Sequence, residues 1–194
     1  VVSQEYEGGP IRGSAWGAQL WAWFCSDGDN AVYTPEKISD LLQPVPDQFT
    51  AFIHSASWGR DNRGAYDSEC EMFDRYLWQN PEYLPVISAG NDGYGAGTVG
   101  SPGSAKNVLG VGATQNARKG FDGGWGNGGP KKVARFSSRG PCKSGRIKPD
   151  IAAPGVGILS TRSLGVNYDY GIYDDNYAYS SGTSMACPLT AGAV

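Results

Sequence analysis

The chain has 194 residues, 40% of them hydrophobic, which is enough to bury one core and too short to indicate two domains. Its net charge of -3, its pI near 5.1 and its lack of a basic run argue against nucleic-acid binding. The longest apolar run is far shorter than the ~20 residues that span a bilayer, which argues against a membrane protein. Abundant glycine and aromatic residues favour a loop-rich secreted enzyme, so we expect an extracellular or secretory-pathway location.

Short apolar runs alternate with amphipathic segments along the chain. The runs predict strands at 18–24, 51–55, 84–89, 108–113 and 147–153, and the amphipathic segments predict helices at 35–42 and 67–79. The second helix is expected to place Cys70, Phe73, Leu77 and Trp78 on one face. Strand and helix in alternation predict an α/β fold with a mostly parallel sheet and right-handed crossovers. The glycine-rich segment 120–129 predicts a hairpin or a surface loop.

The cysteine pattern argues against a zinc site. Cys25, Cys70, Cys142 and Cys187 include no CxxC pair and no metal-ligand spacing. One disulfide is compatible with the sequence, and Cys25 with Cys70 is the favoured pair because both lie near predicted loops. Cys187 is expected to be a small buried residue instead.

Two predicted turns follow neighbouring strands of the sheet. Ala56-Ser57-Trp58-Gly59 follows the strand at 51–55, and Ser88-Ala89-Gly90-Asn91-Asp92-Gly93 follows the strand that begins at Leu84. Ligands of parallel sheets gather beyond the carboxyl ends of the strands, so both turns are expected to open on one edge. The amide of Asn91 there is a candidate donor to an oxyanion, a contact typically worth ~3 kcal/mol in acyl transfer.

The segment Ser181-Gly182-Thr183-Ser184-Met185-Ala186-Cys187-Pro188 predicts a tight turn that opens into a helix of small residues. Gly182 permits close approach of the backbone, and Thr183 is expected to cap a helix that runs to Val194. Pro188 is expected near the first turn, where the hydrogen bond that it removes costs least. Ser184 then lies at the positive end of the helix as a candidate nucleophile, and it needs a general base.

These blocks, in this order, resemble the subtilisin-like serine proteases over most of the chain. Segment 181–188 is similar to the family's nucleophile motif, and 88–93 is similar to the segment with its oxyanion-hole asparagine. Phe136-Ser137-Ser138-Arg139-Gly140-Pro141, followed by 148–155, resembles the stretch before that motif. Segments 54–59 and 101–107 are similar to a bacterial alkaline-protease branch.

The resemblance implies a three-layer fold and assigns roles to particular residues. Ser184 would be the nucleophile, and the side chain of Asn91 with the Ser184 amide would form the oxyanion hole. The segments Ser57-Trp58-Gly59 and Ser88-Ala89-Gly90 would bind the backbone of an extended polypeptide substrate, since strand-like edges pair with peptide amides. These roles imply an endopeptidase that needs no cofactor for its chemistry.

The chain departs from the family because it contains neither the triad aspartate nor the triad histidine motif. His54, the sole histidine, lies before Ser57 and is expected to be structural, and Asp27, Asp29 and Asp40 have contexts unlike the family's aspartate. Residues 1–194 are therefore expected to be a partial catalytic domain, incomplete at both ends. We expect it to be almost inactive alone and to require the rest of the domain or a partner chain.

Alternative interpretations remain open at several positions. A subtilase-derived structural or binding protein without catalysis is the main alternative, and a lipase is remote because Ala186 stands where Gly-x-Ser-x-Gly has its second glycine. Trp58 is equally compatible with core packing and with a subsite wall. Structural calcium is compatible with the family. The acidic residues that could bind it are Asp27/Asp29, Asp61 and Asp174/Asp175, but none has a recognisable calcium-loop pattern, so solvated turns are favoured there.

Overall fold

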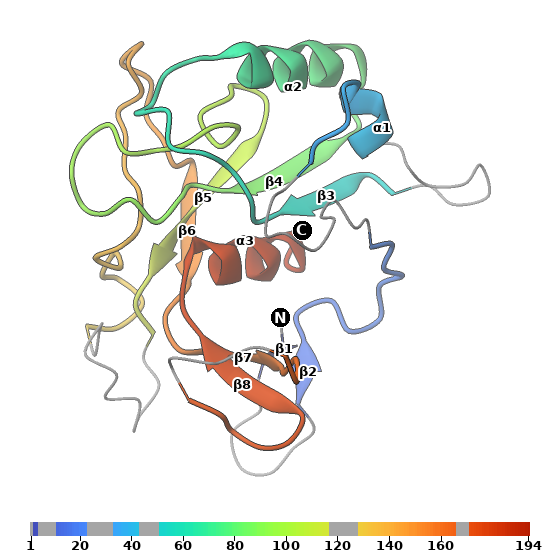
Figure 1. Cartoon of the computed structure of the whole chain (residues 1–194), viewed down its shortest axis with the longest axis vertical. Coiled ribbons are helices and arrows are strands. Elements are labelled where there is room, and N and C mark those ends of the chain that lie inside the picture. The colour runs from blue at the N-terminus through green and yellow to red at the C-terminus, as the bar shows by residue number, and fades with distance from the viewer. Residues whose placement is uncertain (1, 4–10, 23–32, 43–50, 117–127, 166–170) are drawn as a thin grey trace.

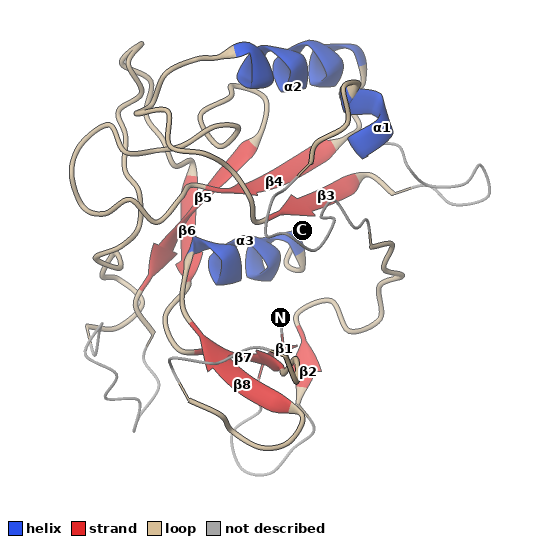
Figure 2. Cartoon of the chain, in the orientation of Figure 1, coloured by secondary structure: helices blue, strands red, loops and turns tan. Residues whose placement is uncertain are grey.

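A four-stranded parallel sheet forms the centre of the protein (Figure 2). The computed structural model describes residues 2–3, 11–22, 33–42, 51–116, 128–165 and 171–194. The strands lie in chain order: β3 (Ile53–Ala56), β4 (Leu84–Ser88), β5 (Leu109–Thr114) and β6 (Ile151–Pro154). The register pairs Ala56 with Ile87 and Ser88 with Val111, so the carboxyl ends of these strands meet at one edge.

Helices cover both faces of this sheet, which gives the expected three layers (Figure 1). Helices α1 (Ile38–Leu42) and α2 (Ser68–Gln79) lie on one face, and α3 (Thr183–Ala191) lies on the other. Neighbouring residues of β4 point to opposite sides. Ile87 belongs to the core cluster under α1 and α2, whereas Val86 belongs to the cluster under α3. The α/β fold predicted from the sequence is confirmed.

Two small antiparallel pairs lie outside the main sheet. Strand β1 (Val2–Ser3) pairs with β2 (Arg12–Gly13), and β7 (Ile158–Thr161) pairs with β8 (Tyr177–Ser180). Strand β8 leads directly into the turn before α3, so this second pair fixes the approach of the chain to Ser184.

Helix α2 buries only part of the face that the sequence predicts. Its N-cap is Asp67, whose side chain accepts a hydrogen bond of 3.0 Å from the Cys70 amide. Phe73 and Leu77 are buried with Cys70. Trp78, predicted on the same face, is 83% exposed, because it follows Leu77 by one residue and is turned about 100° away from it.

Several predicted boundaries are wrong. The described part of the strand expected at 18–24 is a loop in which Leu20 is 91% exposed. The helix predicted at 35–42 is formed only from Ile38 to Leu42. The strand expected at 147–153 begins at Ile151, since Pro149 has no amide hydrogen to give to the ladder. Of the segment 120–129, residues 120–127 lie outside the described residues.

The cysteines also differ from expectation. Cys70 is a free, buried thiol that lies 3.2 Å from Ser104 Oγ, which contradicts a disulfide with Cys25. Cys25 itself lies outside the described residues. Cys187 is fully buried, as predicted. Among the helices of the described ranges, none is long and apolar enough to cross a membrane.

The contrast between Phe73 and Trp78 on α2 predicts effects on stability of very different size. Phe73→Ala should lower the free energy of unfolding by about 3 to 5 kcal/mol, because it leaves a cavity at a side chain that is 1% exposed. Trp78→Ala removes more atoms from the same helix but should change stability by at most about 0.5 kcal/mol. Urea unfolding of both variants measures this difference, and equal effects would contradict the assigned packing of α2.

Candidate active site

The two predicted peptide-binding segments follow adjacent strand ends. Ser57-Trp58-Gly59 begins directly after β3, and Ser88-Ala89-Gly90 begins with the last residue of β4. Because β3 and β4 are parallel neighbours, the segments lie on the same edge. Gly90 has φ of 106°, and a Cβ there would lie 2.9 Å from Ser138 Oγ. The turn after β4 therefore requires glycine at this position.

The turn before α3 is fixed by hydrogen bonds with the loop after β6. The Gly182 amide donates to the Gly155 carbonyl at 2.8 Å, and the Gly157 amide donates to Ser181 Oγ at 2.9 Å. Gly182 is the N-cap, and as a glycine it has no side chain with which to cap the helix. The expectation that Thr183 caps α3 is therefore wrong, because Thr183 is already the first helical residue.

Asn91 connects the turn after β4 to the first residue of α3. Its Oδ1 accepts two hydrogen bonds of 2.9 Å, from the Thr183 amide and from Thr183 Oγ1. Both donors identify the oxygen of this side-chain amide, so Nδ2 carries the hydrogens that Asn91 offers to a ligand. Thr183 thus fixes the orientation that an oxyanion donor at Asn91 requires.

Ser184 lies beside the segment after β3. Its Oγ donates to the Ser57 carbonyl at 3.4 Å, and Ser57 Oγ donates to the Ser184 carbonyl at 3.0 Å. Ser184 is half-buried in the first turn of α3, where backbone amides lack partners within their own helix. The structure therefore brings Ser184, Asn91 and both predicted peptide-binding segments together at one sheet edge.

His54 has the environment of a structural residue. Burial lowers its pKa from 6.5 to about 4, because a charged imidazole would lose its hydration. Within the described ranges, its Nε2 atom is buried and has no hydrogen-bond partner. An imidazole with so low a pKa is neutral at pH 7 but is a weak base, and Nε2 makes no hydrogen bond to Ser184 in the described structure.

Trp58 packs against the core. It lies against the cluster under α1 and α2, and its ring centroid is 6.4 Å from that of Phe73. Of the two interpretations left open by the sequence, this contact favours core packing. The indole thereby ties the segment after β3 to the inner face of α2.

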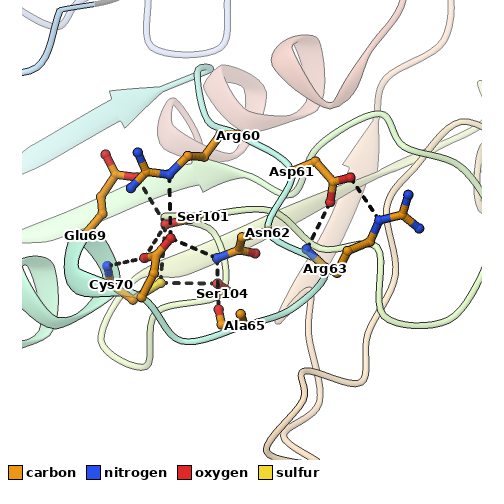
Figure 3. A network of polar contacts seen from close by, with 10 residues as sticks. Arg60, Asp61, Asn62, Arg63, Ala65, Glu69, Cys70, Ser101 and Ser104 are labelled. Atoms are coloured by element: carbon orange, nitrogen blue, oxygen red, sulfur yellow. Dashed lines mark hydrogen bonds and ion pairs between the residues drawn. The ribbon is translucent and has the colours of Figure 1, made fainter.

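A polar network fixes the chain directly after Gly59 (Figure 3). Arg60 and Ser101 exchange two backbone hydrogen bonds, of 2.9 and 3.0 Å. The Arg60 guanidinium lies 3.2 Å from Glu69, and Ser101 Oγ lies 3.1 Å from the same carboxylate oxygen. Ser101 Oγ also lies 2.8 Å from Asp67, the N-cap of α2. The segment after β3 is thus held by Trp58 on one side and by this network on the other.

Two of the candidate calcium residues, Asp61 and Asp174, engage protein partners. Asp61 pairs with Arg63, and Asp174 accepts the amides of Asn176 and Tyr177. No group of three or more His, Cys, Asp or Glu side chains suited to a metal ion occurs among the described residues. Asp27 and Asp29 lie outside them.

Two residues that support the site have roles that the sequence does not reveal. Thr183 orients Asn91. Ser138 contacts the turn after β4, where its Oγ accepts a hydrogen bond from the Asp92 amide at 3.0 Å. Both contacts join positions that lie far apart in the chain. A single sequence carries no local signal for such pairs.

Comparison with known proteins gives a consistent result. A sequence model of the Subtilase family matches residues 2–194. Pyrolysin from Pyrococcus furiosus is 37% identical over 95% of this chain and 14% of its own length. The serine protease AprX from Bacillus subtilis is 41% identical over 55% of this chain and 24% of its own. Among solved structures, Sphericase is 31% identical with a TM-score of 0.51, over 73% of this chain and 40% of that one. The chain thus spans less than half of the length of each of these relatives.

The contact between Gly155 and Gly182 predicts a steric effect at the turn before α3. A Cβ at Gly155 would lie 2.6 Å from Ala113 Cβ and 2.7 Å from the Gly182 carbonyl oxygen. Gly155→Ala should therefore cost about 1 to 3 kcal/mol of stability and speed hydrogen exchange of the Gly182 amide. Gly165→Ala is the control, since nothing lies within 4 Å of its Cβ. Unchanged exchange in Gly155→Ala would contradict this packing.

The half-buried His54, whose Nε2 atom is buried, predicts a pH dependence of stability. Its folded pKa of about 4 lies below the unfolded value of 6.5, so the unfolded state binds the proton first. The stabilisation associated with the neutral imidazole is complete above pH 6.5 and is lost as the pH falls towards 4, by about 3 kcal/mol in total. Between pH 7 and 4 the wild type should lose that much more stability than His54→Gln in urea unfolding. Parallel losses in both proteins would contradict the burial of this side chain.

Proposed function

The chain belongs to the subtilase family, and on this premise we propose that residues 1–194 are part of the catalytic domain of a serine endopeptidase. Ser184 Oγ attacks the carbonyl carbon of a peptide bond and its proton passes to a general base. The carbon–nitrogen bond then breaks, the base returns the proton to the leaving amine, and an acyl-enzyme remains on Ser184 until water hydrolyses it. The contacts of Ser184 with Ser57 and of Asn91 with Thr183 support this proposal most directly.

The oxyanion that forms during this attack needs donors fixed in advance. Nδ2 of Asn91 is available for that role because Thr183 occupies Oδ1. The Ser184 amide, in the first turn of α3, is the second proposed donor. Donors held by the fold need no reorganisation when charge develops, which is why such sites are effective.

The proposed substrate is an extended polypeptide. Ser57-Trp58-Gly59 and Ser88-Ala89-Gly90 follow adjacent strand ends, so they offer two backbone edges between which a peptide can pair. Attack by serine needs no cofactor. Calcium stays a prediction, with a role in stabilising the fold and none in the reaction. An extracellular or secretory-pathway location is part of the same proposal.

The general base has to come from residues outside these 194. His54 is the sole histidine; it is half-buried and weakly basic, and within the described residues its Nε2 makes no hydrogen bond to Ser184. The triad aspartate and histidine would therefore be supplied by further sequence of the domain or by a partner chain. The same observation supports a second candidate function, a subtilase-derived binding protein that performs no hydrolysis.

Labelling of the nucleophile separates the two functions. In the protein that includes the remaining part of the domain, a fluorophosphonate probe should label Ser184, and Ser184→Ala should abolish both labelling and peptidase activity. The 194-residue chain alone should retain no more than the residual rate, ~10³ to 10⁴ over water, of an enzyme without its base. A longer protein that binds peptides but never labels would favour the binding protein.

The proposed oxyanion donor predicts a specific kinetic effect. Asn91→Ala should lower kcat about 10² to 10³-fold and change KM little, because the donor acts mainly in the transition state. Asn176→Ala is the matched control, since Asn176 is an exposed residue in the turn before β8 and has no proposed role in the site. Steady-state kinetics of both variants in the longer protein provide the test. An effect of Asn91→Ala on KM alone would rule out this role.

A further inference from the structure

Pro188 leaves the Ser184 carbonyl without the backbone donor that it would have in a regular α-helix. In an α-helix each carbonyl accepts from the amide four residues later, and for Ser184 that residue is Pro188. Proline has no amide hydrogen, and its ring crowds the carbonyl four residues before it. Pro188 lies inside α3, not in its first turn as expected from the sequence. The missing hydrogen bond is therefore the one that would have held the Ser184 carbonyl.

The Ser57 hydroxyl takes the place of this missing hydrogen-bond donor. Ser57 Oγ donates to the Ser184 carbonyl at 3.0 Å across 127 positions of sequence. The hydroxyl has one hydrogen, so the bond commits the donor capacity of this side chain. In return Ser184 Oγ donates to the Ser57 carbonyl at 3.4 Å. Two reciprocal bonds thus join the residue after β3 to the second residue of α3.

Other contacts fix the residues on either side of Ser184. Asn91 holds Thr183, as described above. Cys187 Sγ lies 3.1 Å from the Val86 carbonyl and 3.4 Å from the Ala56 carbonyl, so the helix is also anchored just before Pro188. A thiol is a weak donor, and its bonds do not involve the Ser184 carbonyl. Ser57 Oγ is the side chain that supplies this carbonyl with a donor.

We infer that Ser57 is a positioning residue, whose hydroxyl replaces the amide that Pro188 lacks and thereby fixes the Ser184 backbone on the end of β3. This role of the side chain is separate from the peptide-binding role proposed for the backbone of Ser57. Its consequence for catalysis rests on the function proposed above. Misplacement of a reacting group by about 1 Å can cost 10²-fold in rate, so loss of this bond should act on kcat.

A double-mutant cycle between Ser57 and Pro188 tests the inference, because Pro188→Ala restores the amide that the hydroxyl replaces. In the longer protein, Ser57→Ala should lower kcat about 10-fold or more with little change in KM, since the backbone at Ser57 is unaltered. The loss should be several-fold smaller in the Pro188→Ala background. Ser57→Thr keeps the hydroxyl and should retain most of kcat, and Ser144→Ala, an exposed serine whose Oγ accepts from Arg146, is the control.

Hydrogen exchange of the longer protein tests the same inference by a readout that is independent of catalysis. Ser57→Ala should speed exchange of the Met185 amide, which donates to the Gly182 carbonyl at 3.1 Å, and Pro188→Ala should restore its protection. The amide of residue 188 in that variant should itself be protected if it binds the Ser184 carbonyl. Ser57→Thr provides this comparison if Ser57→Ala does not fold.

The two experiments give distinct outcomes. Equal effects of Ser57→Ala in the wild-type and the Pro188→Ala backgrounds, in exchange and in kcat, would overturn the positioning role. If Ser184→Ala leaves peptidase activity intact, the proposed function fails, yet the exchange pattern still decides whether Ser57 replaces the missing amide. Coupling in exchange together with coupling in kcat would support both.

Discussion

The contact between the first turn of α3 and the ends of β3 and β4 is the constraint on which this site depends. Ser57 bonds Ser184, Asn91 bonds Thr183, and Cys187 contacts the carbonyls of both strands. These bonds join positions separated by about half of the chain or more. Because the sheet is parallel, the turns after both strands reach the helix from the same edge. The proposed chemistry is therefore a property of this junction and not of one motif.

The two core clusters keep this junction rigid. Alternating residues of β4 anchor α2 on one face of the sheet and α3 on the other. The network around Ser101 adds polar contacts that hold the chain after Gly59 to the start of α2. Proline within a nine-residue helix would weaken it, yet here the exposed carbonyl becomes an attachment point for a residue of the sheet edge. An apparent defect of the helix thus fits the need for a fixed nucleophile.

These residues contain the other proposed parts of the site but no residue suited to be its general base. The proposed oxyanion donors, the proposed peptide-binding edges and Ser184 all lie within these residues, whereas His54 is half-buried and has a pKa of about 4. Each of the first three depends on contacts within one contiguous unit. A base needs only to reach Ser184 Oγ, so it can come from another segment without change to this junction.

The sequence by itself determined the strand at Leu84, the helix after Asp67, the α/β class and the family, because apolar periodicity and glycine-containing motifs are local signals. It also selected Ser184 and Asn91 through the motifs around them. Tertiary structure alone decided that Trp78 is exposed, that Cys70 is a free thiol, and that Thr183 orients Asn91. It likewise showed that Ser57 supplies the donor absent at Pro188. Such pairings depend on which segments, far apart in the sequence, the packed sheet brings into contact. A local sequence pattern holds no information about the partner segment.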